Sequence, residues 1–104
     1  MEGIERRWIH TNGIKMHIAE KGKGPLVLLV HGFPETWLSW IHQINHLAAH
    51  GYHVVAPDMR GYGESDCPQY PSSYTIFHTV GDLIGLLDEL VEQQVIFLSR
   101  WWPL

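Results

Sequence analysis

The sequence predicts an α/β fold in which an antiparallel β-hairpin is followed by a βαβαβ unit. Three observations lead to this prediction. Residues 14–19 alternate apolar and polar side chains directly after Asn12-Gly13, a pair that favours a type I′ hairpin turn. Residues 26–30 are all apolar, as in a strand covered on both faces. Apolar residues three and four apart at 36–50 and 76–91 indicate two amphipathic helices between strands.

The hairpin is expected over residues 5–20, with antiparallel strands on either side of the turn. A polar loop at 21–24 separates the hairpin from the apolar run, which opens after Pro25. Strands that are apolar along their whole length are typical of parallel sheets with both faces covered. Residues 26–30 are therefore predicted to form a central, parallel strand.

The first helix is predicted to begin at Thr36 and to end at His50, where Gly51 supplies a left-handed stop. A short β-branched run at 52–56 predicts the next strand. The second helix is indicated by an apolar stripe: Ile76, Phe77, Val80, Leu83, Ile84, Leu87, Leu90 and Val91. Residues 95–98 are predicted to add one more buried strand, and the alternation implies right-handed crossovers.

Bulk composition limits the kinds of protein this can be. The 104 residues suffice for one domain, predicted to occupy 1–94, with 95–104 as a divergent tail. A composition of 45% hydrophobic and 17% charged residues is globular. The net charge of −4 argues against nucleic acid as a partner, and the longest apolar run is too short for a membrane span. The single Cys67 and the absence of a signal-like start predict a cytoplasmic protein.

The segment His31-Gly32-Phe33-Pro34-Glu35 lies between a buried strand and a helix. It is thus expected at the carboxyl end of a sheet strand, where α/β folds bind ligands. Gly32 allows a close backbone approach, and Pro34 has no N–H, so the free donor at the tip is the N–H of Phe33. That N–H is suited to one half of an oxyanion hole. A strand-to-helix turn without any ligand explains the same pentapeptide equally well.

Several segments together carry a family resemblance. They are Asn12–Glu20, His-Gly-Phe-Pro-Glu at 31–35 with Trp37 and Trp40, Asp58-x-Arg-Gly-Tyr-Gly-x-Ser, and the stretch Ser73–His78. In this order and spacing the sequence closely resembles the soluble, plant-type epoxide hydrolases, which have the α/β-hydrolase fold. The resemblance covers roughly residues 1 to 94. It implies that the chain is the amino-terminal portion of an α/β-hydrolase sheet, with the lid and the carboxyl-terminal half absent.

The resemblance implies a reaction in two steps, the conversion of a small-molecule epoxide to a vicinal diol without metal or cofactor. An Asp opens the epoxide to an alkyl ester while two lid tyrosines donate protons, and a His-activated water then hydrolyses the ester. By the same resemblance Phe33 supplies one oxyanion N–H. His31, with Gly32 and Pro34, shapes the loop, and Trp37 lines the pocket.

The family pattern breaks near the end of the sequence, where an elbow with the nucleophilic Asp is expected. Residues 95–104 contain no carboxylate in any register. Ser99 is a poor substitute because Phe97 and Trp101 occupy the positions that need small residues, and Ser65 lies in a structural loop of the family. No complete catalytic set is therefore present, and no turnover is expected.

Two further groups of polar residues favour structural roles. His42, His46 and His50 lie four residues apart on one helix face, but no carboxylate accompanies them, so a solvated face is preferred to a metal site. Asp58 is expected to hydrogen-bond its own loop and Arg60 to pair locally.

Three interpretations stay open from the sequence. The chain is an inactive, truncated member of the epoxide hydrolase family, or a non-catalytic short isoform that binds a full-length hydrolase, or an incomplete sequence of an active enzyme. Association with itself or with another hydrolase is expected to use an open sheet edge, because unpaired strand edges recruit further strands.

Overall fold

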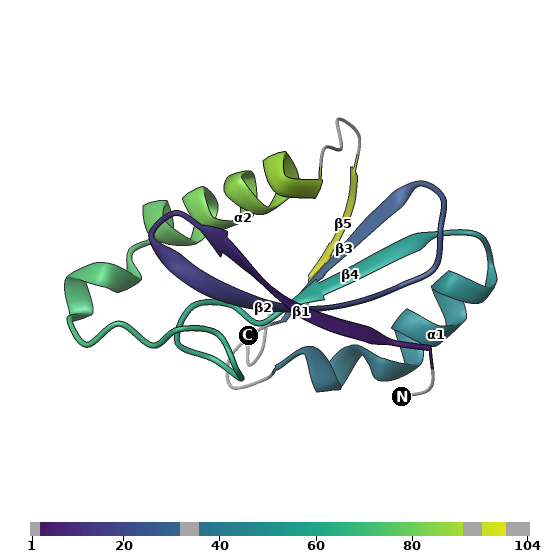
Figure 1. The fold of residues 1–104 in the computed structure, drawn as a ribbon, viewed down its shortest axis with the longest axis horizontal. Coiled ribbons are helices and arrows are strands. Elements are labelled where there is room, and N and C mark those ends of the chain that lie inside the picture. The colour runs from purple at the N-terminus through teal and green to yellow at the C-terminus, as the bar shows by residue number, and fades with distance from the viewer. Residues whose placement is uncertain (1–2, 32–35, 91–94, 100–104) are drawn as a thin grey trace.

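The computed structural model describes residues 3–31, 36–90 and 95–99. The elements follow one another as β1 (Glu5–Thr11), β2 (Ile14–Lys21), β3 (Leu26–Val30), the 3-10 helix η1 (Trp37–Trp40), α1 (Ile41–Ala49), β4 (His53–Pro57), the 3-10 helix η2 (Pro71–Tyr74), α2 (Ile76–Leu90) and β5 (Val95–Ser99). A hairpin followed by βαβαβ is thus confirmed (Figure 1).

The hairpin turn has the geometry that Asn12-Gly13 predicted. Asn12 has a φ of 49° and Gly13 a φ of 81°, and a type I′ turn requires positive φ at both central residues. Strands β1 and β2 pair antiparallel on either side of the turn, with Thr11 opposite Ile14. The turn therefore fixes the register in which β1 and β2 pair.

The strands form one mixed sheet in the order β1-β2-β4-β3-β5. Strand β3 lies parallel to both β4 and β5, so the prediction of a central, parallel strand at 26–30 is confirmed. Strand β2 pairs antiparallel with β4 and joins the hairpin to the parallel part. Because β3 and β4 are parallel, their carboxyl ends, at Val30 and Pro57, meet at the same edge of the sheet.

One helix covers each face of the sheet, as Figure 1 shows. Under α1 the buried apolar cluster consists of Ala19, Val27, Leu29, Trp37, Trp40, Ile44, Val54 and Ala56. Under α2 it consists of Ile9, Ile14, Met16, Ile18, Leu26, Leu28, Val55 and Leu86. Strand β3 supplies residues to both clusters in alternation, which explains why its sequence is apolar throughout.

The single helix expected from Thr36 to His50 is instead a 3-10 turn followed by an α-helix. Ser39 donates its backbone N–H to the carbonyl of Thr36 at 3.1 Å, the i to i+3 bond of a 3-10 turn. The N–H of Trp37 is already taken by a carboxylate from another loop. This bond satisfies an N–H at the start of the helix that has no acceptor within the helix.

Strand β5 confirms that residues 95–98 form a last strand. The expectation that this strand would be buried is wrong at Ile96. Ile96 is 48% exposed, because β5 lies at the end of the strand order and pairs with β3. Residues 32–35, 91–94 and 100–104 lie outside the described part of the chain. The boundary predicted between 1–94 and a tail at 95–104 therefore stays a prediction.

Candidate functional site

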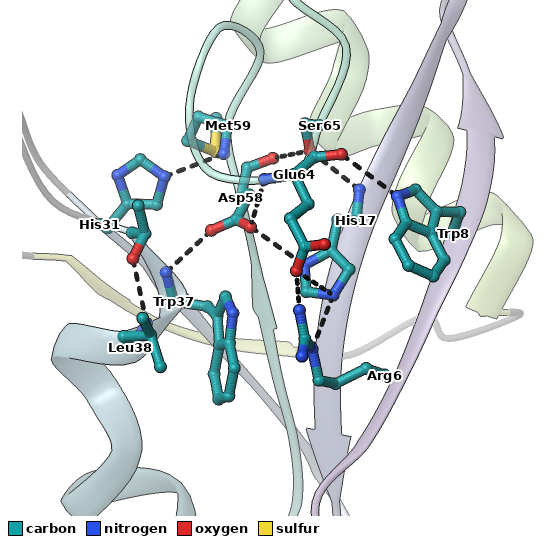
Figure 2. A network of polar contacts seen from close by, with 11 residues as sticks. Arg6, Trp8, His17, His31, Trp37, Leu38, Asp58, Met59, Glu64 and Ser65 are labelled. Carbon is teal, nitrogen blue, oxygen red and sulfur yellow. Dashed lines mark hydrogen bonds and ion pairs between the residues drawn. The ribbon is translucent and has the colours of Figure 1, made fainter.

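The carboxylate of Asp58, directly after β4, is the centre of a buried polar network (Figure 2). The side chain is fully buried. Its Oδ1 accepts the backbone N–H of Trp37 at 2.8 Å, and its Oδ2 accepts the N–H of Glu64 at 3.1 Å. Oδ2 also lies 3.0 Å from Nδ1 of His17. One carboxylate therefore joins β2, the start of η1 and its own loop.

The neighbours of His17 determine which of its ring nitrogens carries the proton. Arg6 donates Nε–H to Nε2 of His17 at 3.1 Å, so Nε2 must be the acceptor. Nδ1 therefore carries the hydrogen and donates it to Asp58. An imidazole with one donor and one acceptor nitrogen is neutral, and this one lies beside the ion pair of Arg6 with Glu64. Burial lowers the pKa of His17 below its ordinary value of 6.5, against the opposing effects of the Asp58 hydrogen bond and charge.

Acidification is expected to destabilise the chain through His17. Its folded pKa lies below 6.5, so the unfolded chain binds the proton more readily in the window between the two values. The stabilisation is complete above pH 6.5 and is lost as the pH falls through this window. Urea unfolding at pH 7.5 and pH 5.0 measures it, with His17→Asn as the variant that keeps a donor toward Asp58 but does not titrate. An equal pH dependence in both proteins would contradict the assignment.

His31 connects the end of β3 to the loop after β4. Its Nε2 accepts the backbone N–H of Met59 at 2.9 Å, and its ring meets Tyr62 edge-on with centroids 5.1 Å apart. The side chain is buried. An apolar residue at this position would leave the buried N–H of Met59 without this acceptor.

The residues on either side of the predicted oxyanion loop are both hydrogen-bonded to the segment that follows β4. His31, which precedes the loop, is bonded to Met59, and Trp37, which follows it, is bonded to Asp58. Gly32, Phe33 and Pro34 themselves lie outside the described residues, so the direction of the Phe33 N–H stays a prediction.

Trp37 lies in the core on the α1 face of the sheet. Its side chain is 3% exposed, and the guanidinium of Arg6 lies 5.3 Å from the centre of its ring. Its ring is also 6.2 Å from that of His17. The role predicted for Trp37 as a pocket-lining residue stays a prediction.

Comparison with known proteins decides the family. Residues 25–98, well over half of the chain, match the α/β hydrolase fold family. The chain belongs to this family. Epoxide hydrolase 3 of Siraitia grosvenorii is 56% identical over 102 residues, covering 98% of this chain and 32% of that protein. Epoxide hydrolase A of Mycobacterium tuberculosis is 44% identical over 98 residues, covering 92% of this chain and 30% of that protein.

Solved structures agree with this result. The crystal structure of an epoxide hydrolase from Vigna radiata has a TM-score of 0.96 at 56% identity, covering 98% of this chain and 32% of that one. A laboratory-evolved variant of potato epoxide hydrolase has a TM-score of 0.90 at 45% identity, covering 95% and 32%. This α/β hydrolase chain thus spans about a third of the length of these relatives.

Among its described helices, none is long and apolar enough to cross a bilayer.

The loop of this hydrolase that follows Asp58 is closed by Ser65. Its hydroxyl donates to the Asp58 carbonyl at 2.5 Å and accepts the backbone N–H of His17 at 2.8 Å. Both bonds are to backbone groups, and the side chain is buried. The geometry supports the structural role expected for Ser65.

The prediction that Arg60 pairs with a group close to it in the sequence is wrong. Its Nε and Nη2 donate to the two carboxylate oxygens of Asp82, in the middle of α2, each at 2.7 Å. Nη1 and Nη2 also donate to the carbonyls of Ser73 and Asn12, at 2.7 and 3.3 Å. The expectation that Asp58 hydrogen-bonds its own loop is confirmed only in part. It accepts the N–H of Glu64 in that loop, but it also bonds Trp37 and His17 outside it.

His17 and Asp82 were missed from the sequence. His17 is the polar member of an alternating strand, so its burial is not visible in the pattern. Asp82 carried a usable signal: it lies four residues before the buried Leu86 and thus on the same helix face. A carboxylate on the apolar face of a helix needs a cation, and Arg60 supplies it.

His42 and His46 of α1 and His50 at its C-cap form no group suited to a metal ion. His50 Nδ1–H donates to the carbonyl of His46 at 2.8 Å, and the two rings are 4.4 Å apart. Across residues 3–31, 36–90 and 95–99, no three His, Cys, Asp or Glu side chains form a group suited to a metal ion.

A separate polar cavity of about 270 Å³ lies at the opposite edge of the sheet from Asp58. It is lined by residues that include Glu5, Glu20, Lys21, Lys23 and His53. Glu20 is already paired there with Nε2 of His53 at 3.1 Å. Its mixed charges neutralise one another, so the cavity offers no concentrated charge to a ligand.

Proposed function

We propose that this chain forms the amino-terminal third of an epoxide hydrolase and contributes the oxyanion-binding loop to its active site. The observation that carries the proposal is that both residues flanking this segment are hydrogen-bonded, His31 to Met59 and Trp37 to Asp58. Oxyanion donors act only when they are preorganised. The two buried hydrogen bonds of the flanking residues His31 and Trp37 support this proposal.

The chemistry follows from the similarity to epoxide hydrolases. A carboxylate oxygen attacks an epoxide carbon, the carbon–oxygen bond breaks, and the departing oxygen is protonated. Water then adds to the carbonyl of the resulting ester, and the negative charge that develops on the carbonyl oxygen is stabilised by N–H donors. Phe33 N–H is the donor that we assign to this chain. The nucleophile, the base and the proton donors are assigned to the part of the fold that follows the matched residues 25–98.

A joined protein tests this proposal, with residues 1–98 of this chain followed by every residue of Siraitia grosvenorii Epoxide hydrolase 3 that comes after the position aligned with residue 98. It is expected to convert an aryl epoxide to its diol. The 104-residue chain alone is expected to give no diol above a buffer blank, because no carboxylate lies at the expected elbow. A folded but inactive joined protein would contradict the proposed function. Turnover by the chain alone would contradict the assignment of the nucleophile.

Three finer expectations belong to the same proposal. The substrate is a small epoxide, as the names of the relatives suggest. The protein acts in the cytoplasm, in keeping with an exposed, unpaired Cys67. Association through an open sheet edge would use β5, whose pairing partner among the described strands is β3.

A further inference from the structure

The hairpin turn presents an asparagine followed by a glycine, the dipeptide in which asparagine loses its amide most readily. In this reaction the backbone nitrogen of the second residue attacks the side-chain carbonyl carbon of the first, and glycine leaves that nitrogen unshielded because it has no Cβ. Asn12 and Gly13 are both exposed, and a Cβ added at Gly13 would meet nothing within 4 Å. The turn is therefore open to the water that the reaction consumes.

The second asparagine of the sequence, Asn45, gives an internal comparison. It lies within α1 and is followed by His46, whose side chain shields the backbone nitrogen. Its amide oxygen accepts a hydrogen bond from Nζ of Lys21 at 2.8 Å. The backbone of Asn45 is fixed by the helix, so this asparagine is expected to keep its amide when Asn12 does not.

The amide of Asn12 joins the tip of the hairpin to α2, which lies beside it in Figure 1. Nδ2 of Asn12 donates to the carbonyl of His78 at 3.2 Å and to Oδ1 of Asp82 at 3.1 Å. A Cβ added at Gly81 would lie 2.7 Å from the same nitrogen, so the amide packs closely on the helix. Both hydrogen bonds need a donor at this position, and an ionised carboxylate has none.

A carboxylate at position 12 would face two acceptors instead. Asp82 is fully buried, and both of its oxygens are bonded to Arg60. An oxygen in the place of Nδ2 would lie against Oδ1 of Asp82 and the carbonyl of His78 with no hydrogen between them. Two negative charges at this separation repel each other. The new side chain must turn away, and both hydrogen bonds to α2 are then lost.

We propose that Asn12 is a deamidation site and that its conversion releases the hairpin tip from α2. The nitrogen of Gly13 bonds to Cγ of Asn12, the bond between Cγ and Nδ2 breaks, and Nδ2 leaves as ammonia with the proton of the Gly13 N–H. Water then opens the cyclic imide at one of its two carbonyl carbons, which gives aspartate or isoaspartate. The reaction consumes water alone, involves no oxidation and does not depend on epoxide chemistry.

The same two hydrogen bonds control how fast the amide is lost. Movement of Cγ toward the Gly13 nitrogen pulls Nδ2 away from His78 and Asp82, so the tip must first separate from α2. Such local opening costs the hydrogen bonds that it breaks. Deamidation of Asn12 is therefore expected to be roughly tenfold slower in the folded chain than in the denatured chain.

The rate is tested with the 104-residue chain, incubated in mildly alkaline buffer with and without guanidinium chloride. Peptide mass spectrometry measures the conversion of Asn12 and of Asn45 in the same samples. Asn12 is expected to convert first in both, and faster in denaturant. The proposal is overturned if Asn12 converts no faster than Asn45. It is also overturned if the denaturant leaves the rate at Asn12 unchanged, because the bonds to α2 would then restrain nothing.

The release of the tip is tested by thermal melting. Deamidated protein is separated from the parent by its added negative charge, and its melting temperature is expected to be lower by roughly 4–8 °C. Asn12→Asp is expected to reproduce this fall. Asn45→Asp is the matched control: it makes the same chemical change but keeps an acceptor for Lys21, so no fall is expected.

If Asn12→Asp does not fold, the separated deamidated protein provides the same measurement, since it folded before the conversion. A deamidated protein that melts at the temperature of the parent would overturn the proposed release. So would an equal fall in Asn12→Asp and Asn45→Asp, because the effect would then come from added charge and not from the contact with α2.

Discussion

Arg60→Met is expected to lower the free energy of unfolding of this chain by about 3–5 kcal/mol. The substitution removes a guanidinium that is 5% exposed and bonded to both carboxylate oxygens of Asp82. Asp82 would then remain fully buried without a counter-ion, and the carbonyl of Ser73 would lose its donor. Domains of this size are stable by about 5–15 kcal/mol, so the loss is a large part of the total. Urea denaturation followed by circular dichroism measures it.

Arg7→Met is the matched control for that prediction. Arg7 pairs with Glu20, but its side chain is 51% exposed, so its loss is expected to cost under about 1 kcal/mol. The double variant Arg60→Met with Asp82→Leu is expected to recover part of the stability, because it leaves no unpaired charge in the core. If Arg60→Met costs no more than Arg7→Met, the buried pair does not have the structural role assigned to it.

Asp58→Asn is expected to cost about 2–4 kcal/mol, although the two side chains have nearly the same shape. Both oxygens of Asp58 accept hydrogen bonds, one from Trp37 and the other from Glu64 and His17. An amide has one acceptor and one donor end, so in either orientation its NH₂ faces an N–H group. Urea denaturation measures the loss of stability of the whole chain. Hydrogen exchange at the Trp37 amide measures the local effect, and faster exchange is expected in the variant than in the parent.

Asp66→Asn is the control within the same loop. The Asp66 carboxylate accepts one bond, from the backbone N–H of Lys15 at 2.9 Å, and the residue is exposed. An asparagine oxygen can accept that bond equally well, so a change below about 1 kcal/mol is expected. Equal stability of the two variants, together with unchanged exchange at Trp37, would show that Asp58 does not hold the start of η1.

Most of the fold was predictable because its signals are local. Asn12-Gly13 specifies a turn by the φ values that these residues tolerate, and the run at 26–30 specifies a strand covered on both faces. The apolar stripe from residue 76 predicted the start of α2. The first helix begins after Thr36 and ends at His50 as predicted, and only the 3-10 form of its first turn was not visible in the sequence.

Of the candidate site, only the residues that belong to a sequence motif could be predicted. The positions of His31 and of Asp58 at one edge of the sheet follow from the parallel strands that they terminate. The partners of these residues do not follow from any local pattern. Arg60 bonds a residue on α2, and His17 reaches Asp58 from the hairpin, across separations of 22 and 41 residues.

The sequence by itself determined the strand and helix order, the turn, the α/β hydrolase resemblance and the lack of a carboxylate at residues 95–104. The tertiary structure decided which buried polar groups meet. The physical reason is that periodicity and turn chemistry act over a few residues. By contrast, a buried charge is satisfied by whichever group the completed sheet brings within 3 Å, as Asp82 is by Arg60.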